Sequence, residues 1–240
     1  MKIITISLLS LLFTMSVNAD DTMFNTIQSV EVYEVVTDED GQEIHHLVND
    51  SKIPNVYERL AKTQGVTKVG IGDILMKTRK IIALGKEIYE IVKAGKPVVD
   101  IVEATPVEVL PHDNGVAIPA VELSGWNAPV SKKYLLKTKN YLGMSPVVFE
   151  FMLLFSYGGS NQGVGAYITG AQIKPTRVSV KWGYNFSAKF KVQTIVNEGS
   201  MNDPVAGVVL MMDNTIQTVL QEERMSKTFY INGLGQVNAY

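Results

Sequence analysis

Histidines and carboxylates are the residues of this chain whose types could support chemistry, but the histidines are few and the carboxylates are dispersed along the chain. The three histidines are His45, His46 and His112, and the chain contains no cysteine. Disulfides, thiolate nucleophiles and cysteine-based zinc sites are therefore excluded. His45 and His46 are adjacent in a β-rich run, where neighbouring side chains point to opposite faces, so local geometry does not let them share a metal.

His112 opens a His-Asp-Asn-Gly sequence that is typical of a turn. It is the one residue on which a hydrolase hypothesis can be centred, and nothing in the sequence singles out a nucleophile for it. The acidic run Asp38-Glu39-Asp40 could offer oxygens to Ca²⁺, but the EF-hand spacing is absent and a solvated turn is the simpler interpretation. Nucleophile-elbow and phosphate-binding-loop motifs are absent too. We therefore predict no catalytic residues, no metal site, no cofactor and no enzymatic activity.

Aromatic rings, glycines and amides gather between residues 157 and 186 and supply the candidate binding site. Exposed rings could serve as platforms for a sugar, with amides as hydrogen-bonding groups. They could also dock at the headgroup level of a membrane. Packing in a β-core is the alternative use of such rings. The candidate binding residues are Tyr157, Asn161, Gln162, Tyr167, Trp182 and Tyr184.

The elements that position these residues are predicted to be mainly β-strands. Residues 130–138 and 147–157 alternate at the period of a strand, and further short strands follow, each bounded by Gly, Pro, Asn or Asp. Many short strands at close spacing indicate an antiparallel β-sandwich over residues 98–240. Nearer the N-terminus, Asp38 to Gly41 separates two β-rich runs, 30–36 and 44–48, which predicts a hairpin.

Between the hairpin and the sandwich, the apolar residues follow a helical period. Ile74, Ile81, Ile88 and others fall on one face at 100° per residue, which predicts a long amphipathic helix over 73–94. Gly95 and Pro97 stand where such a helix would end. The predicted fold class is thus α+β, mainly β, with an N-terminal hairpin and helical region over 20–97. Packing of this helix against the sandwich is favoured, and its insertion into a membrane is the alternative.

The first nineteen residues match a secretory signal peptide. Lys2 precedes an apolar stretch from Ile3 to Val17, which is too short for a membrane span. Val17 and Ala19 fit a signal-peptidase site, so we expect cleavage after Ala19 and a secreted or periplasmic product. An exported chain without disulfides is more typical of bacteria.

Composition and charge limit the classes of partner that the protein is expected to bind. The chain has 22 Lys and Arg against 24 Asp and Glu, a net charge of −2, which does not favour nucleic-acid binding. We therefore expect an exported, non-enzymatic binding protein that recognises a glycan, an envelope component or a protein. A membrane-active, pore-forming toxin that uses helix 73–94 is the alternative, and peripheral membrane contact and self-association both stay open.

Overall fold

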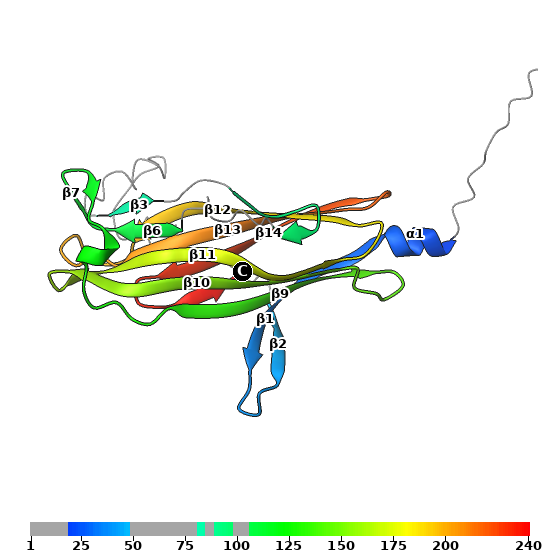
Figure 1. Cartoon of the computed structure of the whole chain (residues 1–240), viewed down its shortest axis with the longest axis horizontal. Helices are drawn as coiled ribbons and strands as arrows, with labels where there is room; N and C mark the ends of the chain where they lie inside the picture. The colour runs from blue at the N-terminus through cyan, green and yellow to red at the C-terminus, as the bar shows by residue number, and fades with distance from the viewer. Residues whose placement is uncertain (1–18, 49–80, 85–88, 98–105) are drawn as a thin grey trace, which may run out of the picture.

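The computed structural model describes residues 19–48, 81–84, 89–97 and 106–240, and these residues form mainly antiparallel β-structure with one short α-helix. The larger sheet has seven strands in the order β2-β1-β9-β10-β11-β6-β3, and the second has six in the order β15-β14-β13-β12-β4-β5. Strands β7 and β8 form a separate pair. The mainly β, antiparallel character predicted from the sequence is confirmed (Figure 1).

The elements have the following bounds: α1 Ala19–Asn25, β1 Ile27–Thr37, β2 Glu43–Leu47, β3 Ile82–Leu84, β4 Tyr89–Lys93, β5 Lys96–Pro97, β6 Val107–Leu110, β7 His112–Asp113, β8 Val116–Ala117, a 3-10 turn Ala120–Glu122, β9 Val130–Asn140, β10 Val147–Asn161, β11 Val164–Val180, β12 Asn185–Asn197, β13 Ala206–Gln217, β14 Glu222–Asn232 and β15 Val237–Ala239.

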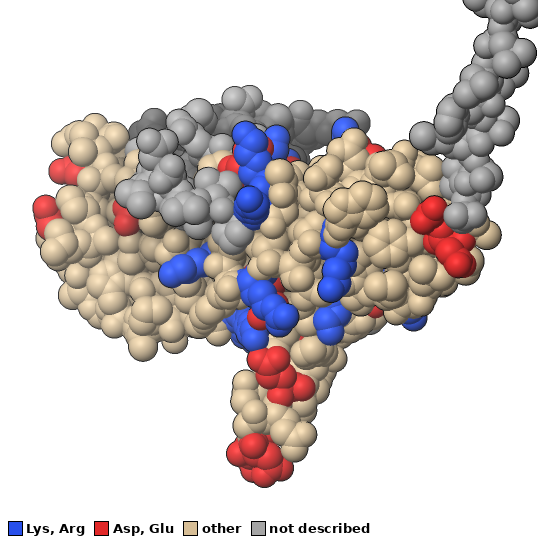
Figure 2. Space-filling model, turned by 45° about the vertical axis from the view of Figure 1, so that its right-hand side comes forward, with Lys and Arg blue, Asp and Glu red and all other residues tan. Residues whose placement is uncertain are grey.

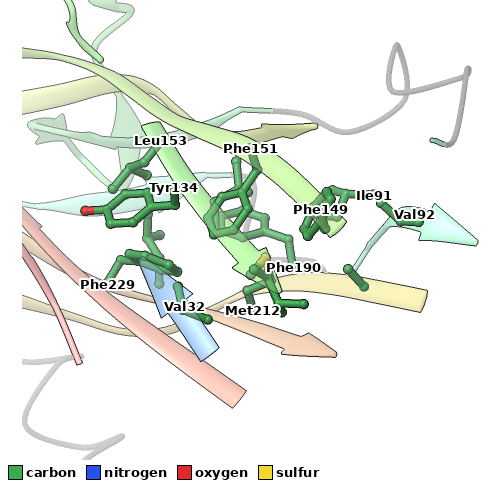
Figure 3. Close-up of a cluster of buried hydrophobic side chains, with 14 of the residues drawn as sticks. Val32, Ile91, Val92, Tyr134, Phe149, Phe151, Leu153, Phe190, Met212 and Phe229 are labelled. Atoms are coloured by element: carbon green, nitrogen blue, oxygen red, sulfur yellow. The ribbon is translucent and has the colours of Figure 1, made fainter. Parts of the chain in front are cut away.

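The hydrophobic core lies between the two large sheets. Alternate residues of β10, from Val147 to Phe155, are buried, as their period of two predicts. Phe151 of this strand stacks on Tyr134 of β9, with ring centroids 5.5 Å apart. Tyr134 also meets Phe229 of β14 at 4.9 Å, edge to face, across the space between the sheets (Figure 3). Aromatic contacts of this kind add to the stabilisation from buried apolar area and hold the sheets face to face.

The prediction of a long helix over 73–94 is wrong in every part of that range that the structure describes. Ile82–Leu84 is strand β3, paired with β6, and Tyr89–Lys93 is strand β4, paired with β12. Positions 73–80 and 85–88 lie outside the described residues. The pore-forming alternative named this helix as its inserting element, and the described part of the range is strand.

The physical reason lies in the residues that seemed to end the helix. Ala94 and Gly95 both have positive φ, 49° and 74°, and form the two-residue turn between β4 and β5. Such turns need φ above zero at both central positions, so Gly95 acts as a hairpin residue and not as a helix cap. Ile91 and Val92 are both fully buried in the core, and this burial overrides their helical spacing.

Strands β1 and β2 form the predicted hairpin, and its outer part projects from the sheets as an arm, residues 36–47 (Figure 1). At the turn, Asp38 Oδ1 accepts hydrogen bonds from the backbone N–H groups of Asp40 (3.0 Å) and Gln42 (2.7 Å). This carboxylate therefore closes the turn. The tip of the arm is acidic (Figure 2), and every residue of β2 is exposed.

Several boundaries differ from the sequence expectation. The glycine-rich stretch from Gly158 belongs to β10 up to Asn161, and the turn is confined to Gln162 and Gly163, both with positive φ. Strand β13 continues through Asp213, where a break was expected. The predicted signal peptide, up to residue 18, lies outside the described residues, and so do residues 98–105 at the start of the predicted sandwich region. Among the described residues, no helix combines the length and apolar character needed to span a bilayer.

Candidate functional site at the helix end

The six predicted binding residues do not form one cluster, because the fold separates them between two ends of the sheets. Trp182 and Tyr184 lie in or beside the β11–β12 turn, at the end that carries α1 (Figure 1). We call this end the helix end. It comprises α1, the β9–β10 connection (141–146), the β11–β12 turn (181–184) and the β13–β14 turn (218–221).

The other four predicted residues lie at the opposite end of the sheets, which we call the far end. They lie on strands β10 and β11 and in the 162–163 turn that joins these strands: Tyr157, Asn161, Gln162 and Tyr167. The far end also includes the β12–β13 loop (198–205) and the β14–β15 turn (233–236). A hydrogen bond from the N–H of Gly165 to Asp203 Oδ1, 2.9 Å, joins two of these segments. A shared sugar platform built from all six residues is therefore incompatible with the observed arrangement.

Burial separates the predicted rings further. Tyr167 and Tyr184 are only 3% and 5% exposed, and burial raises the pKa of each phenol. Core packing, the alternative use considered for these rings, therefore describes both. Tyr157 is half-buried, whereas Trp182 is 90% exposed and offers its whole indole to solvent. Trp182 is thus the predicted ring that is open to a partner.

Helix α1 joins the three connections of the helix end into one unit. The carbonyl oxygen of Phe24 accepts a hydrogen bond from the side-chain amide of Asn140 at 3.1 Å, and another from the Tyr184 hydroxyl. The Phe24 ring also packs edge to face on Tyr184, with centroids 5.6 Å apart. The carbonyl of Asn25 accepts a hydrogen bond from the Thr218 hydroxyl at 2.8 Å. Residues 24 and 25 therefore contact or adjoin all three connections.

The helix end carries large apolar side chains that stay between 40% and 90% exposed. Besides Trp182, the helix end exposes Val219, which is 80% exposed, and further apolar residues of the β9–β10 connection, the β13–β14 turn and α1. The exposed apolar set of the helix end is Met23, Tyr141, Leu142, Met144, Trp182, Val219 and Leu220. A gathering of this kind at loop tips, bordered by polar residues, is typical of an interaction surface.

The connections that bear this set are short and internally bonded. In the β9–β10 connection, Asn140 Oδ1 accepts hydrogen bonds from the backbone N–H groups of Leu142 (3.2 Å) and Met144 (2.9 Å). In the β13–β14 turn, the Thr218 hydroxyl accepts hydrogen bonds from the N–H groups of Leu220 and Gln221. The apolar side chains are therefore presented on a preformed backbone.

The histidines and carboxylates do not assemble into a comparable site. His45 approaches Glu43 at 3.8 Å on the exposed arm, and His112 lies on β7 with its Nδ1 buried and unbonded. Asp213 is bound by Lys191 at 2.6 Å and by Ser226 at 2.5 Å. Across the described ranges, no three His, Asp or Glu side chains come close enough together to hold a metal ion.

Sequence reasoning found Trp182 but missed its apolar neighbours. Residues 141–142 lay in an unassigned connection, and residues 219–220 fell inside one of the short predicted strands, 215–221, whereas the structure ends β13 at Gln217. Tyr141-Leu142 and Val219-Leu220 are pairs of large apolar residues placed between strands. Connections of globular domains are usually polar, so apolar pairs at these places were the available signal. Their convergence depends on which strand ends meet, and a single sequence does not reveal that.

Comparison with protein-family models, with curated proteins and with solved structures finds no match to this chain. The functional argument therefore depends on the residues and on the geometry described above.

Proposed function

We propose that the protein is an exported, non-enzymatic binding protein whose β-sandwich attaches to an envelope component through the helix end. The observation that carries the proposal is the exposed apolar set on three connections and α1. Large exposed apolar surfaces cost solubility, and soluble monomers rarely keep them without a use. The predicted export signal places such a protein in contact with envelope material.

The arrangement supports attachment better than catalysis. A catalytic site needs a nucleophile or acid–base group within hydrogen-bond reach of a partner group in a sheltered place. The helix end offers apolar side chains at tips that stand in solvent, Trp182 above all. These side chains can supply binding energy by leaving water, which amounts to roughly 1.5–3 kcal/mol for each one fully buried.

The test is co-sedimentation of the mature chain, residues 20–240, with isolated bacterial envelopes. We expect the wild-type chain to sediment with the envelopes and the triple variant Leu142→Ser, Trp182→Ser, Leu220→Ser to stay in the supernatant. A matched far-end variant, Val164→Ser, Met201→Ser, Leu234→Ser, removes three exposed apolar side chains elsewhere and should sediment like the wild type. Equal binding by both variants would contradict attachment through the helix end.

A further inference from the structure

The residue types at the helix end are those of a lipid–water interface. Tryptophan and tyrosine prefer the headgroup level, where an amphipathic ring has one apolar and one wet side. Trp182 and Tyr141 provide these rings, and the aliphatic residues beside them, such as Leu142 and Leu220, suit the acyl boundary. A folded protein or a sugar would need a complementary or concave surface, whereas projecting tips suit a fluid layer that closes around them.

The three connections can enter such a layer together. They are tied to the same two residues of α1, Phe24 and Asn25, and their backbones are already hydrogen-bonded. Docking therefore requires no refolding, and the conformational entropy cost of ordering loops on binding is small. No element has to leave the core.

Charge at the helix end argues against an electrostatic partner. We count α1, the three connections and three strand residues on either side of each connection. These segments hold four acidic residues, Asp20, Asp21, Glu222 and Glu223, and three basic residues, Lys139, Lys181 and Arg224. The net charge is 3 − 4 = −1. A polybasic segment is what anionic lipid headgroups attract, and this end lacks one in the described chain.

The chain also enters the fold at this end. Helix α1 begins at Ala19, and the residues that precede it in sequence contain the apolar stretch from Ile3 to Val17. The predicted signal peptide therefore leads directly into the helix end.

We infer that the envelope component bound by the helix end is the uncharged lipid–water interface of a bilayer, into which Trp182 and the tips 141–144 and 219–220 dock without a helix being inserted. This inference rests on the proposed function and names its partner.

The experiment measures binding to phosphatidylcholine vesicles by flotation, with the mature chain and the two triple variants defined above. We expect wild type to float with the vesicles, equally at low and high salt, without release of an entrapped dye. The helix-end variant should bind about tenfold more weakly or worse, because three of its apolar side chains no longer leave water. The far-end variant should bind like wild type, and urea unfolding checks that both variants fold.

Each other outcome overturns the inference. If the chain sediments with envelopes but does not bind vesicles, the proposed function still holds. The partner would then be a glycan or a protein of the envelope. Binding that needs anionic phosphatidylglycerol and disappears in high salt would indicate headgroup-charge recognition. Equal loss in both variants would indicate nonspecific adsorption, and dye release would indicate insertion.

Discussion

Phe151 shows at the scale of one residue how the core is held. Its ring is fully buried and meets Phe149 at 5.0 Å, Tyr134 at 5.5 Å and Phe229 at 5.9 Å. Truncation to alanine would leave a cavity between the sheets, so Phe151→Ala should lower the free energy of unfolding by about 3–5 kcal/mol.

Urea unfolding of the purified variant measures this loss. Trp182→Ala is the matched control, because its ring is large but 90% exposed, and it should change the free energy of unfolding by less than about 0.5 kcal/mol. A large loss in Trp182→Ala would mean that the indole packs within the fold and is not free to dock.

Asp213 makes a pH-dependent contribution on the outer face of the six-stranded sheet. Partial burial raises its pKa, but hydrogen bonds from Lys191 and Ser226 outweigh that effect, and the pKa is lowered below its usual value of 3.8. A lowered pKa in the folded state stabilises the fold above the unfolded-state pKa, and this stabilisation is lost as the pH falls.

Asp213→Asn should therefore reduce the free energy of unfolding at neutral pH, and the difference from wild type should vanish at a pH well below 3.8, where Asp213 is protonated in both states. The side chain is 37% exposed, so solvent screening keeps the loss under about 1 kcal/mol. Urea titrations at the two pH values measure it. A deficit of the same size at both would show that shape, not charge, is responsible.

At the scale of elements, the strands were predictable where turn chemistry and period agree. Strands β9 and β10 follow from their alternation, and the arm hairpin follows from the Asp-Gly step at its turn. Within 81–94 a helix was wrongly predicted, because the apolar residues at 91 and 92 fit both a helix face and a buried strand. Residues 89–93 form strand β4 because the edge of β12 is available for them to pair with.

Asn140, the last residue of β9, links helix α1 to the β9–β10 connection. Its buried side chain donates to the Phe24 carbonyl and accepts from Leu142 and Met144, and it thereby ties α1 to the β9–β10 connection. Asn140→Ala removes these bonds and leaves backbone groups without partners. We expect a loss of about 1–3 kcal/mol in the free energy of unfolding.

Hydrogen exchange localises that effect. Amides of residues 22–27 and 142–144 should exchange faster in Asn140→Ala, while those of β13 keep their protection. Asn202→Ala, in the exposed part of the β12–β13 loop, is the control and should leave all of these rates unchanged. Faster exchange spread evenly over both sheets would show that Asn140 supports the whole fold and has no specific link to α1.

At the scale of the whole molecule, the arrangement of the two ends of the sheets determines which residues can form one site. This arrangement is the feature that is hardest to predict from the sequence. Trp182 and Tyr157 are 25 positions apart, yet they lie at opposite ends of β11 and its partner strand. Val219 and Met23 are distant in sequence, yet they share the helix end through the bond between Thr218 and Asn25. The sequence identified the aromatic residues, and the antiparallel connections between the strands determine which of these residues lie close together.

The same geometry predicts how the molecule stands on a bilayer. Strand β11 has 17 residues and so spans roughly 50 Å at 3.3 Å per residue, which separates the far end from the membrane surface by about that distance. The arm leaves the sheets between the two ends (Figure 1). Docking through the helix end therefore holds the acidic tip at Asp40 away from the lipid, where it stays free for another contact.

Single cysteines test this orientation, because the chain contains none of its own. We expect a polarity-sensitive dye at Val219→Cys to shift to the blue and brighten when phosphatidylcholine vesicles are added, since position 219 enters the interface. The same dye at Met201→Cys, on the far end, and at Asp40→Cys, on the arm, should not respond. Comparable shifts at positions 219 and 201 would contradict end-on docking, and a shift at position 40 alone would assign lipid contact to the arm.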